Sequence, residues 1–273
     1  MTTTVWILGD QLSPSASSPK ELAPDECVIL MIESLGRARK LPYHKQKLTF
    51  IWSAMRHFAA ELRELGYNVD YYELQPAFRP ALETHIRVYR PERVRLMEAA
   101  EFGGSTRLAK LVGTLGVKAD IIPNNMFLSD RAGFATWASG RKTLLMESFY
   151  RKMRRQTGLL MDGDSPEGGQ WNYDKENRET PPADHQFPEL PVYEPDQITG
   201  TVIEEVARRF PDNFGELDCF WLPVTRQDAG AFFADFLAQR LDLFGPYEDA
   251  MVTGERSLYH SLLSSLLNVG LLN

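Results

Sequence analysis

The stretch Thr4-Val5-Trp6-Ile7-Leu8-Gly9-Asp10-Gln11-Leu12-Ser13-Pro14 decides the fold class of this chain. A short apolar run stops at Gly9, and the polar pair Asp10-Gln11 and a Ser-Pro turn come after it. A continuous apolar strand that ends in glycine and a carboxylate is typical of parallel α/β sheets, whose ligands bind beyond the carboxyl ends of the strands. Residues 9–12 are therefore a candidate binding loop. An ordinary turn, with Asp10 capping the next segment, is the alternative.

The composition is that of a globular protein. The chain has 273 residues, 43% hydrophobic and 25% charged, enough for one large or two ordinary domains. No apolar run reaches the length of a membrane span and no signal peptide opens the chain, so we expect a cytoplasmic protein without membrane contact. Cys27 and Cys219 lie far apart without metal-ligand spacing, which predicts free thiols and no metal site. The net charge of −7 leaves only a local basic patch as a means of binding nucleic acid.

Strand-like and helix-like segments alternate through the first half of the chain. Strands are predicted at residues 28–32, 68–74, 94–98 and 117–122, and helices at residues 44–65, 80–89 and 105–115. Together with the opening strand, this order predicts a five-stranded, doubly wound parallel sheet of the α/β class. Right-handed crossovers then place Asp10, Glu33 and Glu98 at one edge of the sheet. These carboxylates favour a ligand pocket there, and a cap or a solvated position is the alternative for each.

The alternation stops after residue 128, where a basic segment begins. Residues 134–155 contain six Lys and Arg residues with aromatic and aliphatic residues between them, which predicts one or two amphipathic helices. Their basic face could follow a phosphate backbone or could lie in solvent. A Gly-rich stretch and several prolines make the chain extended as far as residue 195. Further helices are predicted at residues 196–210 and 225–244.

The last segment, residues 257–273, is strongly apolar. It predicts a helix with leucines around much of its circumference, which needs neighbours on several sides. We expect either that the sequence is the front part of a longer protein or that a partner covers residues 257–273. His260, Ser261 and Ser264 could bind a phosphate at the start of this helix. Helix capping by the serines is the alternative.

Several blocks of the sequence are long and specific. They are ILGDQLS (residues 7–13), FIWSAMRHF (50–58), GRKTLLMESFYR (140–151), WNYDKENR (171–178) and HSLLS (260–264). These blocks, and with them the whole chain, resemble the iron–sulfur bacterial cryptochromes and photolyases, also described as deoxyribodipyrimidine photolyase-related proteins. The resemblance implies an α/β antenna domain over residues 1–128 and an interdomain segment over residues 129–197. Residues 198–273 would then begin an all-helical FAD domain.

The resemblance also implies an antenna chromophore, 6,7-dimethyl-8-ribityllumazine, bound in the first domain. The positions that match its pocket are Gly9, Asp10, Glu33, His44, Lys47 and Ile51. Arg37 and Lys40 stand where some members carry a glutamate and a tyrosine of this pocket. This sequence departs from the family pattern there, and Glu33 or Asp10 could supply the carboxylate contact instead.

The flavin site is implied to begin near the end of the sequence. The stretch that contacts the FAD phosphates matches His260, Ser261, Leu262, Leu263 and Ser264. Chains of the family continue beyond this point, and the resemblance places most FAD contacts and the cysteines of a [4Fe–4S] cluster there. No catalytic residue is assigned within the 273-residue sequence.

The function that the resemblance implies is that of a blue-light flavoprotein, of which this chain would be the N-terminal half. Light captured by the lumazine would excite reduced FAD, which would donate an electron to a (6-4) or related pyrimidine lesion flipped out of damaged DNA. Cryptochrome-type members sense blue light instead. Two alternatives remain open: a non-catalytic antenna module that binds lumazine or a nucleotide, and a truncated, inactive product.

Overall fold

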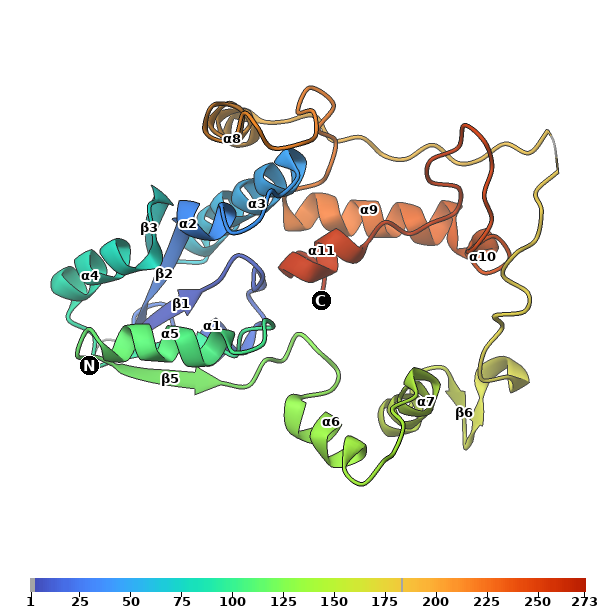
Figure 1. Ribbon diagram of the computed structural model, residues 1–273, viewed down its shortest axis with the longest axis horizontal. Helices are drawn as coiled ribbons and strands as arrows, with labels where there is room; N and C mark the ends of the chain where they lie inside the picture. The colour runs from blue at the N-terminus through green and yellow to red at the C-terminus, as the bar shows by residue number, and fades with distance from the viewer. Residues whose placement is uncertain (1–2, 183) are drawn as a thin grey trace. The chain divides into compact units, whose positions relative to one another are not determined.

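The computed structural model describes residues 3–182 and 184–273. Two compact units make up the fold (Figure 1). The first unit contains the residues up to Met126 together with Pro191–Ala234 and Leu263–Asn273. The second contains Phe127–Leu190 and Asp235–Leu262. In the part of the chain that the structure describes, no helix combines the length and apolar character that crossing a membrane requires.

A five-stranded parallel sheet forms the centre of the first unit (Figure 1). Its strands are β1 (Thr3–Ile7), β2 (Cys27–Ser34), β3 (Asn68–Gln75), β4 (Arg93–Met97) and β5 (Lys118–Ile122). The order is β3-β2-β1-β4-β5, so the chain builds outward from β1 on one side and then crosses back to the other. Val5 of β1 accordingly pairs with Ile29 on one side and Arg95 on the other. The predicted α/β fold class is confirmed, and the strand order reverses between β1 and β4.

Helices cover both faces of this sheet, which explains the continuous apolar runs of β1 and β2. α4 (Phe78–Tyr89) and α5 (Gly104–Gly113) cover the face on which Trp6 and Leu30 are buried. Right-handed crossovers place α3 (Lys45–Glu64) on the opposite face. The predicted helix at residues 44–65 is thus present, with the cap residues at its two ends.

The first unit also contains two later segments of the chain, Pro191–Ala234 and Leu263–Asn273. Its further helices are α1 (Ser17–Lys20), α2 (Leu35–Ala38), α8 (Gln197–Arg209), the start of α9 (Arg226–Gln239) and α11 (Ser264–Val269). α8 packs on α3, and Arg56 of α3 pairs with Glu205 of α8 at 2.7 Å. This contact groups Pro191–Ala234 with the sheet, although the sequence suggested a separate helical domain from residue 198. The predicted division into domains stays a prediction.

The C-terminal stretch differs from the long apolar helix that its composition suggested. The helix covers Ser264–Val269, and Leu266, Val269 and Leu271 are buried. The Val269 carbonyl accepts a hydrogen bond of 2.7 Å from the amide of Leu12 in the loop after β1. These three apolar side chains are covered within the chain. Leu267 remains half exposed.

The second unit consists of short elements joined by extended chain (Figure 1). They are α6 (Arg131–Ala138), α7 (Met146–Thr157), β6 (Met161–Asp162), β7 (Ser165–Pro166), η1 (Glu167–Gly169), the end of α9 and α10 (Leu241–Phe244). The basic segment therefore forms two helices, as its pattern allowed. The helix predicted at residues 225–244 is interrupted at Arg240, which separates α9 from α10.

Candidate ligand site at the carboxyl edge of the sheet

The loop after β1 lies against α3. A Cβ atom at Gly9 would be 2.9 Å from Met55 Sδ and 3.2 Å from Ile51 Cγ2. Such distances are shorter than normal packing contacts, so glycine is what lets the loop approach the helix this closely. Gly9 and Ile51, both predicted for the ligand pocket, are therefore neighbours.

Gln11 fixes the same loop to the end of β4. Its side chain is buried, and its Nε2 donates to the carbonyls of Met97 (3.2 Å) and Glu98 (3.5 Å). Its Oε1 accepts from the Leu8 amide at 3.4 Å. The carboxamide thus satisfies backbone groups of both strand ends at the point where the strand order reverses. The sequence placed Gln11 in the loop but did not predict these hydrogen bonds between the ends of β1 and β4.

A cluster of charges spans the end of β1. Arg37 Nη1 lies 2.7 Å from Glu101 Oε2, and Lys40 Nζ and Arg107 Nη2 each lie 3.0 Å from Glu101 Oε1. Arg37 follows β2 and Glu101 follows β4, with β1 between these strands. The ion pair therefore crosses the edge at which Asp10 lies. The hydrogen bond from Lys40 contributes most to lowering the pKa of the Glu101 carboxyl.

The electrostatics of Asp10 reflect this setting. Desolvation by surrounding protein atoms raises the pKa of the Asp10 carboxyl, and the positive charge of Arg37 acts in the opposite direction. The negative charge of Glu101 also raises the pKa of Asp10, because it disfavours a second negative charge nearby. Asp10 therefore shares its surroundings with both partners of the ion pair. Sequence reasoning missed Glu101, since no strand pattern marks a residue that far into the loop after β4.

Glu33 occupies a different environment from the one expected. β2 continues to Ser34, so the alternation of side chains turns Glu33 toward α3 instead of the strand end. Its carboxylate accepts hydrogen bonds from Arg56 Nε (2.8 Å), Arg56 Nη2 (3.0 Å), the Tyr71 hydroxyl (2.7 Å) and the Leu74 amide (3.0 Å). Desolvation raises the pKa of Glu33, and the hydrogen bond and charge of Arg56 oppose that rise. With its oxygens occupied in this way, Glu33 joins β2, α3 and β3.

His44 and Lys47 lie at the start of α3. His44 is the N-cap, and its Nδ1 accepts from the Gln46 amide at 3.1 Å. The imidazole also packs edge-on against Phe214, with ring centroids 5.0 Å apart. The Lys47 ammonium lies 5.0 Å from the centre of the Tyr43 ring. Lys47 and Ile51 are one helical turn apart, so α3 presents both along one side.

The stretch predicted to begin the flavin site is divided between the two compact units. His260, Ser261 and Leu262 belong to the second unit, and Leu263 and Ser264 to the first. Within the second unit, the His260 carbonyl accepts from Arg240 Nη1 at 3.3 Å. Leu263 is the N-cap residue of α11. The assignment of this stretch to FAD stays a prediction.

The basic helix α7 surrounds an aromatic side chain of the second unit. The guanidinium carbons of Arg151, Arg154 and Arg155 lie 5.3, 5.4 and 4.6 Å from the centre of the Trp171 ring. Arg154 is buried and donates to the Leu160 carbonyl. Part of the basic face predicted to contact DNA or to pack within the protein is therefore used for packing.

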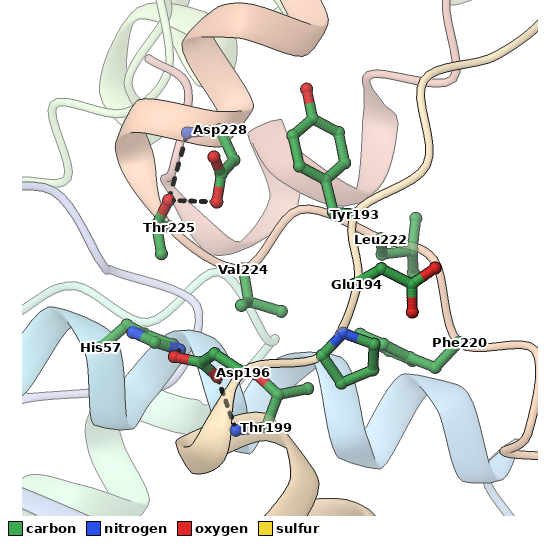
Figure 2. A pocket seen from close by; sticks show the side chains of 11 residues that line it. His57, Tyr193, Glu194, Asp196, Thr199, Phe220, Leu222, Val224, Thr225 and Asp228 are labelled. Carbon is green, nitrogen blue, oxygen red and sulfur yellow. Dashed lines mark hydrogen bonds and ion pairs between the residues drawn. The ribbon is translucent and has the colours of Figure 1, made fainter.

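A hollow lies between the starts of α8 and α9, with a volume of about 330 Å³ including its open mouth. Figure 2 shows helix caps in its wall: Asp196 accepts from the Thr199 amide, and Thr225 pairs with Asp228. His57 Nε2 lies 3.3 Å from Asp196 Oδ2. Partial burial raises the pKa of Asp196, but the Thr199 amide and His57 outweigh it, and the pKa lies below its ordinary value.

The polar side chains of this hollow serve mainly to cap the two helices that begin there. Asp196 caps α8 and pairs with His57, and the Thr225 hydroxyl, which donates to Asp228, accepts from the Asp228 amide at the start of α9. Among residues 3–182 and 184–273, no group of three or more His, Cys, Asp or Glu side chains is placed to hold a metal ion. The carboxyl edge of the sheet is therefore the better candidate for a ligand.

Comparisons with known proteins bear on this candidate. Residues 5–222 match the protein family described as deoxyribodipyrimidine photo-lyase-related protein. A (6-4) photolyase of Agrobacterium fabrum is 43% identical over 278 residues, which cover 100% of this chain and 55% of that protein. An uncharacterized protein of Acanthamoeba polyphaga mimivirus is 27% identical over 185 residues, which cover 64% of this chain and 93% of the viral protein.

A solved structure shares the fold. The crystal structure of a bacterial class III photolyase from Agrobacterium tumefaciens matches with a TM-score of 0.58 and 14% sequence identity. The match covers 99% of this chain and 51% of the other. The chain thus spans about half the length of the two Agrobacterium photolyases that it matches.

Proposed function

We propose, because the chain belongs to the deoxyribodipyrimidine photolyase-related family, that it contributes the light-harvesting part of a light-driven DNA repair protein. The family model covers residues 5–222. The (6-4) photolyase of Agrobacterium fabrum, at 43% identity, supports repair of a (6-4) lesion as the activity of the whole protein. Damaged DNA is then the partner, and FAD the group that would supply the electron.

One observation carries the assignment of a light-harvesting role. The loop after β1, the α3 residue Ile51 and the charged cluster around Glu101 meet at the carboxyl edge of a parallel sheet. In open α/β sheets this edge is the usual place for a ligand. We infer a planar ring stacked beside Ile51, with its polar groups toward Asp10 and Lys47.

The chromophore expected there is a ribityl-substituted ring of the lumazine or flavin class. Gly9 and Ile51 would provide the close apolar contact, and Asp10 and Lys47 the polar ones. Glu33 is left out because Arg56, Tyr71 and Leu74 already occupy its oxygens. When bound, such a ring absorbs blue light and passes the excitation to a flavin.

The remaining cofactors are proposals that rest on the family alone. His260, Ser261, Leu262, Leu263 and Ser264 would contact the FAD phosphates, and a [4Fe–4S] cluster would be held by sequence that longer relatives possess. Blue-light sensing without repair is the second candidate function. A light-harvesting site serves either activity equally well, so the site does not discriminate between them.

The test is the absorption spectrum of the purified 273-residue protein after incubation with 6,7-dimethyl-8-ribityllumazine or FMN and removal of the free ligand. We expect about one bound ring per chain and its loss in Ile51→Arg, which puts an unpaired charge against the ring at a cost of several kcal/mol. The control is Ile121→Arg, a substitution of a partly exposed residue in the edge strand β5. Full retention of the ring by Ile51→Arg would place the site elsewhere.

A repair assay separates the two candidate functions. An oligonucleotide with a (6-4) photoproduct is illuminated with blue light in the presence of the protein and reduced FAD. Restoration of the pyrimidines, by this chain or by a longer gene product that contains it, supports repair. A longer product that photoreduces its flavin normally and leaves the lesion intact would favour light sensing.

A further inference from the structure

The basic segment of the second unit keeps cations that no carboxylate neutralises. Residues 141–155 contain six Lys and Arg residues and one carboxylate, Glu147, although the whole chain has a net charge of −7. Glu147 pairs with Arg151 at 2.7 Å, within α7. In the part of the chain that the structure describes, no other carboxylate forms an ion pair with residues 141–155. The excess of positive charge is therefore local and real.

α7 gathers these cations on one face. With 3.6 residues per turn, Arg151, Lys152 and Arg155 fall within about 100° of the helix circumference, and Ser148 lies between them. The neighbouring side of α7 packs against the aromatic rings of α6 through Phe149. Arg155 is exposed, and the side chain of Arg151 is 39% exposed. A ligand can therefore reach this face without displacing packed residues.

Trp171 orders the same face. The guanidinium carbons of Arg151 and Arg155 lie 5.3 and 4.6 Å from the centre of its ring, and that of the buried Arg154 lies 5.4 Å away. Three positive charges are thus held within about 10 Å of one another, which is about one Debye length, so they repel one another and together attract an anion. Because the ring already restricts these long side chains, binding an anion costs less conformational entropy.

The helix dipole absorbs only a small part of this charge. Glu147 in the first turn and Arg154 and Arg155 in the last turn all lie at favourable ends of α7. The partial charge at each end of a helix is only about half an elementary charge. Four cations and one carboxylate give residues 146–157 a net charge of +3. Most of the positive charge therefore remains to attract an anion from outside the helix.

We propose that Arg151, Lys152 and Arg155 bind the phosphate backbone of DNA. The inference rests on the proposed function, which makes DNA the partner of the whole protein. A row of cations along an accessible helix face suits a polyanion. Contacts to phosphates position a protein on DNA and carry no sequence information by themselves. This face of α7 therefore binds damaged and undamaged DNA alike, and recognition of a lesion belongs to another part of the protein.

The experiment measures the binding of fluorescently labelled duplex DNA to the purified 273-residue protein by fluorescence anisotropy. One duplex is undamaged, and a second of the same sequence contains a (6-4) photoproduct. We expect a Kd on the order of 1–100 μM for both, as for other non-specific DNA binding. Affinity should fall as salt is raised, because each cation that neutralises a phosphate releases a counterion.

Two double variants with the same change in charge locate the surface. Lys152→Gln with Arg155→Gln should weaken binding to both duplexes and reduce the slope of log K against log salt by about two. Lys110→Gln with Lys118→Gln removes the same charge from exposed positions of α5 and β5 and should leave affinity and slope unchanged. Glu147→Gln should tighten binding, a gain that loss of folding cannot produce. Far-UV circular dichroism verifies that each variant folds.

A longer gene product gives a second readout. There, Lys152→Gln with Arg155→Gln should raise the DNA concentration needed for half-maximal repair and leave the repair rate at saturating DNA unchanged. A change in the saturated rate alone would contradict a role in backbone binding.

The possible failures are distinguishable. Absence of DNA binding at low salt, equal losses in the two double variants, or a loss confined to the damaged duplex would overturn the inference. Tighter binding of poly-glutamate than of DNA would also overturn it, because the face would then recognise an acidic polypeptide. Ring binding is measured without DNA, so none of these results decides the light-harvesting role. A longer product that binds both duplexes through α7 and repairs neither would contradict the repair proposal instead.

Discussion

His85 Nδ1 lies 2.6 Å from Asp70 Oδ2, and the same ring places Nε2 2.7 Å from Thr4 Oγ1. The imidazole is fully buried, and it ties α4 to β3 and to β1 through one side chain. A helix on the surface of the sheet is therefore joined to two strands by a titratable group. This arrangement makes the stability of the sheet depend on pH in a definite direction.

Burial lowers the pKa of His85, and the hydrogen bond and charge of Asp70 only partly offset that effect. In the unfolded chain His85 regains its ordinary pKa of about 6.5, so below this pH the unfolded state binds the proton more readily than the folded state. Stability is therefore full above about pH 6.5 and declines as the pH falls toward the lower pKa of the folded state. Urea unfolding at pH 7.5 and pH 5.5 measures the decline. The His85→Gln variant should show less of it, and an equal decline in both proteins would contradict the assignment.

Gly9→Ala should destabilise the first unit by about 1–2 kcal/mol, because the new Cβ would overpack the contact with α3. The cost depends on how far the flexible Met55 side chain can move. Gly113→Ala is the matched control, since among the described residues no heavy atom outside the adjoining helix backbone lies within 4 Å of a Cβ added there. Urea unfolding followed by tryptophan fluorescence compares them. A Gly9→Ala protein as stable as Gly113→Ala would show that the loop does not depend on this close approach.

Arg56→Met should cost about 3–5 kcal/mol, because it leaves the buried Glu33 carboxylate without its cation. The side chains of Arg56 and Glu33 are 9% and 0% exposed, so water cannot replace the lost partner. Arg79→Met removes an exposed pair with Glu83 and should cost no more than about 0.5 kcal/mol. Adding Glu33→Gln to Arg56→Met should restore part of the stability. Similar losses for Arg56→Met and Arg79→Met would mean that the pair is solvated in solution.

Trp171→Ala should loosen the second unit, because three arginines of α7 lose the aromatic ring they surround. Each such contact is worth about 0.5–2 kcal/mol. Limited trypsin digestion is the measurement, and cleavage after Arg151 and Arg155 should become faster. Trp171→Phe retains a ring and should fall between wild type and Trp171→Ala. If all three proteins are digested at the same rate, the cluster contributes nothing to the stability of α7.

The sequence predicted the sheet well because its signals are local. The apolar runs of β1 and β2 require burial on both faces, and the 3.6-residue period of α3 located that helix to within a residue at each end. For residues 257–273 the same reasoning predicted a long helix, whereas the helix covers only Ser264–Val269. Their apolar side chains pack through irregular chain as well as through the short helix α11, and periodicity cannot detect such packing.

The candidate site was predictable only in part. Gly9 and Ile51, which the resemblance assigns to one pocket, are neighbours in the structure, and their assignment to a chromophore stays a prediction. The partners of Glu33 and the presence of Glu101 depend on which loops the strand order brings together. No pattern along one segment contains that information, so the pairing of Arg37 with Glu101 could not be predicted.

Arg226 has a consequence for the order in which the protein folds. Its Nη2 donates to the Leu12 carbonyl at 2.7 Å, its Nη1 to the Leu271 carbonyl at 3.0 Å, and its Nε to Glu61 at 3.0 Å. The loop after the first strand thus acquires its partners only when segments made much later by the ribosome have appeared. Contacts of such long sequence separation form slowly. The sheet can assemble early during synthesis, whereas the loop that would receive the chromophore is completed only after Arg226 and Leu271 have been synthesised, so loading of the ring is expected to follow that point.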